Sequence, residues 1–418
     1  MTSKNLKFLI TGLLLVSFIG MIGCGVNNDN LEDQGYSISN DEGLLGERLS
    51  ETNVLISIES GDSAASKQKR DRSFSLNLVA EIDAPVVDGV QTQATMVSIF
   101  GNSSRASVSY NVQGAGYTGA VDAVQVTSSA NNAIRVRSGI EFTNAKANAV
   151  YVDNNNIWIA HSSEDPSLTG DDGFSAARKF GFRGFNINDN PDHSGLPGFA
   201  ANSIHESSGI VYVTSGNNAG LTLLNNNLSQ TIEYIEIPGA RWVDTDENRI
   251  VVLANDPDSG GTLYVIDKGD TSSRTVYEFD GADTPEAKNT VEIKGDLALV
   301  AAGRSGTHLI DLVTGELIAT IPVPDAASLG LNPDAVESNA ASADEEFIFI
   351  SNGEAGVYVA EASSDLNDYV SGSEISVELL GYLKFDDFQS ANHVAYRNNT
   401  LFVAAGLGGV KAVKLNRN

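Results

Sequence analysis

Asparagine recurs in short segments along the chain, and the carbonyl oxygen of its side chain is a ligand that cations accept. It stands second in each of five segments, and arginine takes that place in a sixth. The segments are "ANAVYV" with Asn148, "ANSIHE" with Asn202, "ARWVDT" with Arg241, "KNTVEI" with Asn289, "SNAASA" with Asn339 and "ANHVAY" with Asn392. His393, which follows Asn392, adds an imidazole to this set.

Two kinds of chemistry fit these asparagines. Converging amide oxygens could coordinate Ca²⁺, a hard cation that prefers oxygen ligands. Asparagine is also a turn former that hydrogen-bonds to its own backbone, and no carboxylate stands at these positions. The pattern therefore favours turns and predicts no metal centre, with calcium as the one possible cofactor. His393 is either a ligand contact or a structural histidine.

An acidic insertion is the second candidate site. The segment "SSEDPSLTGDDG" from Ser162 to Gly173 interrupts the repeat described below. It carries Glu164, Asp165, Asp171 and Asp172. Long loops on a rigid scaffold often hold binding residues, so we predict a binding loop here.

Motifs of the common enzyme classes are missing from the sequence. It has no G-x-S-x-G, no H-E-x-x-H, no Walker loop and no paired C-x-x-C. The formal net charge of −28 opposes contact with nucleic acid or anionic lipid surfaces. We therefore expect a protein that binds a partner rather than an enzyme, and one that does not bind nucleic acid.

The first residues have the form of a secretory signal. Lys4 and Lys7 precede an apolar run from Phe8 to Ile19, and the run ends near the only cysteine, Cys24. The arrangement resembles a bacterial lipobox, with Met21 where leucine is more usual. This resemblance implies removal of residues 1–23 and acylation of Cys24, which would tether the protein to the bacterial envelope, at the outer membrane or cell surface.

The following segment, residues 24–73, is polar and acidic. Its composition predicts a tether between the lipid and the folded domain. The run "NVLISIE" from Asn53 is the part that could add a strand.

The remaining chain, residues 74–418, repeats one hairpin pattern. Two apolar runs flank a Gly-x-x-Gly turn, most clearly at Gly303 and Gly306. The second glycine of successive units stands at Gly119, Gly173, Gly220, Gly261, Gly306, Gly356 and Gly409. Intervals of roughly 40 to 55 residues are typical of solenoids, propellers and arrays.

A seven-bladed β-propeller accounts for this repeat. Each hairpin lies between a short strand and an alternating run, which makes four antiparallel strands per unit and an all-β fold. The last unit has only three strands before Asn418, so we predict that residues 74–82 supply the fourth and close the ring. The asparagines, Arg241 and His393 would then surround one mouth of the central channel.

The hairpin sequences also resemble a known repeat. "TLYVID" from Thr262 and "THLID" from Thr307 are similar to the LVIVD repeat of bacterial surface propellers. The resemblance implies a propeller but assigns no catalytic residues. Two functions remain open: a lipid-anchored scaffold that binds a protein or a glycan, or a Ca²⁺-dependent hydrolase, similar to propeller lactonases, at the channel mouth.

Overall fold

The computed structural model of the chain describes most of its length. The described residues are 35–59, 74–101, 104–127, 134–170, 173–216, 219–256, 260–284, 287–383, 385 and 390–417. They belong to one compact unit, Gly35–Asn418. Cys24 lies outside the described residues.

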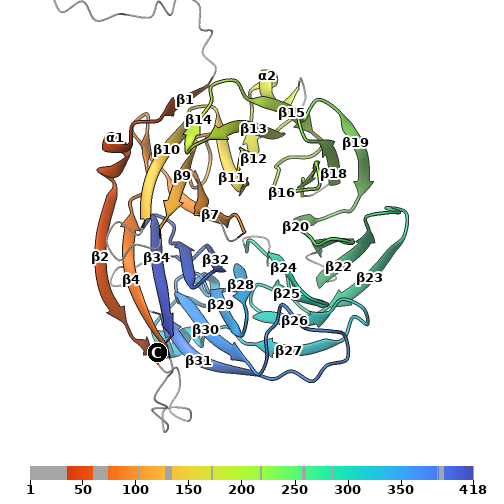
Figure 1. Cartoon of the computed structure of the whole chain (residues 1–418). Helices are drawn as coiled ribbons and strands as arrows, with labels where there is room; N and C mark the ends of the chain where they lie inside the picture. The colour runs from red at the N-terminus through yellow and green to blue at the C-terminus, as the bar shows by residue number, and fades with distance from the viewer. Residues whose placement is uncertain are drawn as a thin grey trace, which may run out of the picture. The chain divides into compact units, whose positions relative to one another are not determined.

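Seven antiparallel sheets of four or five strands form a ring in this unit, and each runs from an inner to an outer strand (Figure 1). The first blade consists of β7 (Gln93–Ile99), β8 (Arg105–Asn111), β9 (Gly119–Val126) and β10 (Ile134–Phe142). The second consists of β11 (Ala145–Val152), β12 (Asn156–Ser163), β13 (Ser175–Arg183) and β15 (Asp192–Leu196), with β14 (Asn186–Ile187) also on β13. The third consists of β16 (Ser203–Ser207), β17 (Ile210–Thr214), β18 (Gly220–Asn225) and β19 (Thr231–Glu236).

The other four blades repeat the same order. The fourth blade consists of β20 (Ala240–Thr245), β21 (Arg249–Asp256), β22 (Gly260–Asp267) and β23 (Arg274–Phe279), and the fifth of β24 (Val291–Lys294), β25 (Leu297–Ala301), β26 (Thr307–Asp311) and β27 (Leu317–Ile321). The sixth consists of β28 (Ala340–Asp344), β29 (Phe347–Ser351), β30 (Val357–Ala362) and β31 (Val377–Leu383). The seventh consists of β32 (His393–Arg397), β33 (Thr400–Ala404), β34 (Val410–Arg417) and β4 (Phe74–Ile82). The prediction of a seven-bladed propeller is confirmed.

Burial explains the hydrophobic pattern of each blade. The second strands β25, β29 and β33 are buried along their whole length, because neighbouring blades cover both of their faces. The residues of the outer strands β23 and β27 are mostly exposed or half-buried. Tyr110 and Phe402, both fully buried, belong to one core cluster shared by the first and last blades. The hydrophobic core therefore lies in the seams between blades.

The Gly-x-x-Gly turns have a steric reason. Gly303 has a φ of 61° and Gly306 a φ of 90°, values that side chains rarely allow. A Cβ on Gly306 would also stand 2.3 Å from the carbonyl oxygen of Ile321 on the outer strand. Glycine is thus required where the hairpin turns back beside the next strand.

The predicted closure strand is present. β4 pairs antiparallel with β34, with Phe74 opposite Arg417 and Ile82 opposite Val410. Figure 1 shows β4 (orange) beside β34 (blue), although they come from opposite ends of the chain. The last blade is therefore completed by the N-terminal part of the chain.

The tether prediction does not hold for residues 35–59. β1 (Tyr36–Ser39) pairs with β10, β2 (Leu49–Ile56) with β4 and β3 (Ile58–Glu59) with β31. Three blades thus gain a fifth strand from this segment, and with β14 and β15 on the second blade four blades have five strands rather than the predicted four. The expectation that the run from Asn53 could add a strand is confirmed by β2 and β3. Composition missed β1, because strands added at an outer edge bury few side chains and so need little hydrophobic sequence.

A buried ion pair fixes the same segment. Arg48 follows α1 (Glu42–Gly46) and donates two hydrogen bonds to Asp122 on β9, of 2.7 and 3.1 Å. The Asp122 side chain is only 2 % exposed. This bidentate pair joins the N-terminal segment to the first blade.

The remaining elements are short. β5 (Val86–Val87) and β6 (Val90–Gln91) form a hairpin after β4, and α3 (Ala326–Leu329) and η1 (Pro333–Ala335) lie between β27 and β28. In the part of the chain that the structure describes, no helix is both long and apolar enough to cross a membrane.

Candidate functional site at the channel mouth

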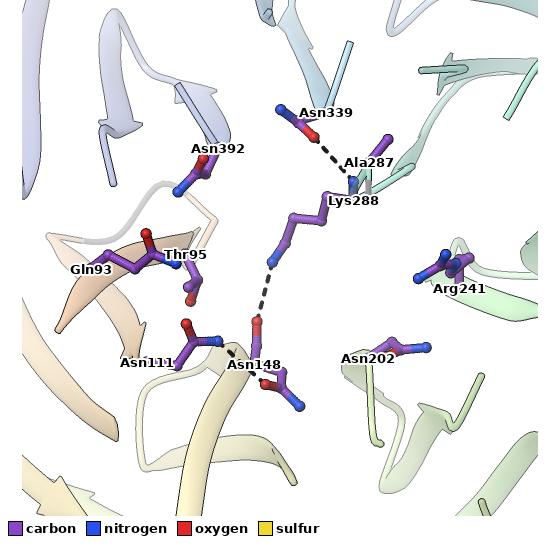
Figure 2. Close-up of a pocket in the computed structure, with 10 residues that line it drawn as sticks. All are labelled: Gln93, Thr95, Asn111, Asn148, Asn202, Arg241, Ala287, Lys288, Asn339 and Asn392. Carbon is purple, nitrogen blue, oxygen red and sulfur yellow. Dashed lines mark hydrogen bonds between the residues drawn. The ribbon is translucent and has the colours of Figure 1, made fainter. Parts of the chain in front are cut away.

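A polar pocket of about 300 Å³ lies where the inner strands begin (Figure 2). All seven blades contribute to it. Its lining residues are Gln93, Thr95, Asn111, Asn148, Asn202, Arg241, Ala287, Lys288, Asn339 and Asn392. Five of the seven predicted mouth residues are therefore brought together: Asn148, Asn202, Arg241, Asn339 and Asn392. We call this cavity the mouth pocket.

The asparagine amides connect neighbouring blades. Asn148 Nδ2 donates to the carbonyl oxygen of Ala201 at 2.9 Å, and Asn392 Nδ2 donates to that of Ala94 at 3.0 Å. In the same way, Asn202 Nδ2 donates to the carbonyl oxygen of Ala240 and Asn339 Nδ2 to that of Ala391, each at 3.4 Å. In the first blade Thr95 Oγ1 donates to Ala147 at 3.3 Å. The prediction that these asparagines mainly cap their own turns is wrong, because their side-chain amides instead donate hydrogen bonds to the next blade.

Lys288 occupies the middle of the mouth pocket. Its Nζ reaches across from the fifth blade to the second and donates to the carbonyl oxygen of Asn148 at 3.2 Å. It also lies 5.6 Å from the centre of the Trp242 ring. Burial lowers the pKa of Lys288 to about 8. The ammonium is therefore charged at neutral pH, although burial raises the free energy of the charged form.

Arg241 brings a second cation to the wall. Figure 2 shows its guanidinium directed toward the pocket from the side of the fourth blade. Arg241 Nε donates to Asn255 Oδ1 at 2.9 Å, which orients the guanidinium. The mouth pocket thus combines amide groups with two positive charges.

Asn289 and His393 lie elsewhere than predicted. Asn289 is fully buried, and its amide donates to the carbonyls of Ala282 and Thr284. It has a φ of 51°, and the residue before it, Lys288, takes the pocket position in this blade. His393 packs on Trp242, with ring centres 5.7 Å apart, and lines a second cavity.

The second cavity, of about 170 Å³, follows the same inner strands further along. It holds a histidine–carboxylate pair, with His205 Nδ1 at 3.4 Å from Asp244 Oδ1. Burial lowers the pKa of His205, although Asp244 opposes that effect. The Tyr151 ring packs on His205 at 4.6 Å. Asp244 Oδ2 also accepts a hydrogen bond from the Ile293 backbone, so this carboxylate serves as a link between blades.

The acidic insertion is used partly for local structure. Asp165 is the N-cap of α2 (Pro166–Thr169) and accepts hydrogen bonds from Ser167, which lower its pKa. Burial and a hydrogen bond with Glu164 raise the pKa of Tyr117. An open groove of about 490 Å³ lies between α2 and β15. Asp171 and Asp172 lie outside the described residues.

Sequence reasoning missed four polar members of the mouth pocket: Gln93, Thr95, Asn111 and Lys288. Thr95 stands at the position of the asparagines in the first blade, and comparing the inner strands by position would have found it. Lys288 was visible as the first residue of "KNTVEI", but its neighbour Asn289 matched the repeat better.

The pocket's charges argue against calcium as a ligand there. Lys288 and Arg241 would repel a divalent cation, and the described residues that line the pocket include no carboxylate. Among the residues that the structure describes, no group of three His, Cys, Asp or Glu side chains could hold a metal ion.

No protein-family model and no curated protein sequence matches the chain. Similar solved structures exist at 11% sequence identity. U3-55K has a TM-score of 0.54 and covers 79% of this chain and 98% of its own. Catalytically inactive virginiamycin B lyase from Staphylococcus aureus with quinupristin has a TM-score of 0.53, with 82% and 99% covered. BamB from Moraxella catarrhalis has a TM-score of 0.47, with 87% and 99% covered. These likenesses concern the fold alone, and by fold this chain is a seven-bladed β-propeller.

Proposed function

We propose that this protein is a binding propeller that holds a glycan in the mouth pocket. The observation that carries the proposal is a single pocket on the ring axis to which all seven blades contribute amide, hydroxyl or cationic groups. Such groups hydrogen-bond well to the many hydroxyls of a sugar. A volume of about 300 Å³ is at the small end of ligand sites and suits one or two sugar rings.

A protein partner is the weaker alternative for this pocket. A stable protein interface buries about 800 Å² on each side, far more than a small pocket offers. A Ca²⁺-dependent hydrolase is also less well supported, since it would place its metal ion next to Lys288 and Arg241.

We also propose that the protein is lipid-anchored to the bacterial envelope, at the outer membrane or cell surface. The support is the sequence around Cys24 and the apolar run before it. On the same kind of support, the hairpin motifs "TLYVID" and "THLID", we group the chain with the LVIVD-repeat propellers.

A blocked pocket tests the glycan proposal. Asn202→Phe would place a large ring in the mouth pocket, and we expect it to abolish binding to an immobilised panel of bacterial glycans. The matched control is Asn155→Phe, because Asn155 is exposed in the turn that follows β11 and does not line the pocket. Equal binding by both variants and the parent protein would refute the proposal, as would failure of the parent to bind any glycan while it binds a protein.

A further inference from the structure

We propose that the mouth pocket selects anionic sugars and that Lys288, with Arg241, holds the anionic group. The inference rests on the proposed glycan function and adds the class of sugar. The anionic group is a carboxylate, as in a uronic acid, or a phosphate ester. Both present oxygens that ammonium and guanidinium groups bind through charge-assisted hydrogen bonds.

The charges of the pocket stand apart from those of the whole protein. The chain has 26 basic and 54 acidic residues, yet in the part of the chain that the structure describes the two charged residues that line this pocket are both basic. Fixed positive groups inside an acidic protein create a local field that attracts an anion where the surface around it repels one. This arrangement favours selection at the pocket rather than general attraction.

Several lysines and arginines of the described chain pair with a carboxylate, whereas Lys288 bonds to a backbone carbonyl. Lys294 pairs with Glu292 at 2.7 Å, Arg249 with Asp296 at 2.9 Å and Lys411 with Glu81. Lys288 Nζ instead donates to a backbone carbonyl, and burial without a compensating carboxylate lowers its pKa. An ammonium has three donors, so this group can bind an anion while it keeps its bond to Asn148.

The hydrogen bonds between blades leave the cations as the groups best placed to bind. Four asparagine amides and Thr95 donate to the neighbouring blade. Asn339 Oδ1 also accepts from the Lys288 backbone, and Asn392 Oδ1 accepts from Ser390 Oγ. A ligand that enters the pocket therefore meets side chains that are already oriented, with Lys288 Nζ at their centre (Figure 2).

The selectivity is expected to depend on pH through Lys288. Among the described residues, the other charged or titratable groups near it are Arg241 on β20 and His393 on β32, while Asp244 and Glu292 line the second cavity. Burial and the Lys288 charge keep the pKa of His393 well below its usual value, so His393 is neutral at pH 7 and above. The other lining residues, on β7, β8 and β11 and just before β16, β24, β28 and β32, do not titrate. Loss of the Lys288 proton above pH 8 should thus weaken anion binding.

Three ligands with one scaffold test the inference: glucose, glucuronate and glucose 6-phosphate. We would titrate each by calorimetry into the full-length protein in detergent micelles at pH 7 and pH 9.5. We expect at least one of the two anions to bind about tenfold more tightly than glucose at pH 7 and to lose most of that preference at pH 9.5. The stronger anion identifies the ligand as carboxylate or phosphate.

Variants at Lys288 make the test specific. Lys288→Met should remove the preference while glucose binding remains, and Lys288→Arg should keep the preference at pH 9.5. Lys268→Met is the matched control, because burial also lowers the pKa of Lys268 but this residue does not line the pocket. Circular dichroism would show that each variant is folded.

The outcomes separate this inference from the proposal beneath it. Equal affinity for the three ligands, or a preference that survives in Lys288→Met, would overturn anion selection and leave glycan binding intact. If none of the three binds but a peptide binds through its free carboxyl terminus, glycan binding is wrong and the inference about sugars falls with it. If other glycans of the panel bind and both anions do not, only the inference fails.

Discussion

One position at the start of the inner strand, repeated from blade to blade, contributes both to the stability of the ring and to the lining of the pocket. Thr95, Asn148, Asn202, Asn339 and Asn392 each bond to the backbone of the next blade, and all of them line the mouth pocket. Polar groups that are satisfied by neighbouring backbone atoms rigidify a site before any ligand arrives. We therefore expect substitutions here to affect stability as well as binding.

Asn392→Asp tests the bond that joins the last blade to the first. An aspartate cannot donate to the carbonyl of Ala94, and its oxygen would face that carbonyl. We expect the free energy of unfolding to fall by about 1–2 kcal/mol, measured by urea denaturation. Asn155→Asp is the control and should leave stability unchanged. Equal stability of the two variants would contradict the role of Asn392 as a link between blades.

Lys288→Met should stabilise the protein while it removes anion binding. The fold lowers the pKa of Lys288 to about 8, below the value of about 10.4 for an unfolded chain, so the charged form is penalised in the folded state. That penalty is complete below pH 8 and disappears as the pH rises from 8 to about 10.4. We expect Lys288→Met to raise the Tm at pH 7, with a gain that shrinks by pH 10.5. A gain that does not vary with pH would show that the charge is not its cause.

At the scale of elements, the N-terminal segment does more than close the ring. β4 completes the last blade, and β1, β2 and β3 then extend the first, last and sixth blades. Because β2 covers the outer edge of β4, the closure strand has a hydrogen-bonded neighbour on both sides. An edge strand that would otherwise be open to pairing with other chains is thus protected.

Successive N-terminal truncations separate these contributions. Removing residues 1–34 should leave the Tm unchanged. Removing residues 1–59 deletes β1 to β3 and leaves Asp122 without Arg48, which we expect to cost about 3 kcal/mol or more. Removing residues 1–82 deletes β4 and should prevent cooperative unfolding altogether. Thermal melts followed by circular dichroism would check the series, and equal melts for the first and second truncations would contradict it.

The glycine spacing predicted the blades well because it reports a local steric need. Gly303 and Gly306 must adopt positive φ beside the next strand, so each hairpin is visible in the sequence. The site was harder to predict because position in the repeat does not settle which way a side chain points. In the fifth blade Lys288 lines the pocket and Asn289 is buried, and no pattern of residue types signals that change. In the N-terminal segment the run from Asn53 indicated a strand, whereas β1 was missed because edge strands carry little hydrophobic sequence.

At the scale of the whole molecule, a ligand on the ring axis would contact several blades at once. Binding to the folded state alone raises the Tm in proportion to the logarithm of ligand concentration. The pocket residues come from blades that are far apart in the sequence, so the ring must be closed before the site exists. Truncation of β4 should therefore remove binding together with stability.

The lipid anchor is tested in the intact protein. We expect Cys24→Ser to abolish partition into the detergent phase of a Triton X-114 separation, because Cys24 is the only cysteine that could be acylated. The propeller should remain folded, with an unchanged Tm. Continued partition of Cys24→Ser into the detergent phase would show that another part of the chain holds the membrane.

The order of the N-terminal strands determines how the molecule responds to mechanical force. A pull on the N-terminus would load β1 first, then the Arg48–Asp122 pair, then β2 and β3, and only afterwards β4. Each early step lengthens the chain and dissipates work while the seven blades stay closed. The segment before the ring would thus unfold and extend under load before the closure strand β4 is pulled out of the last blade.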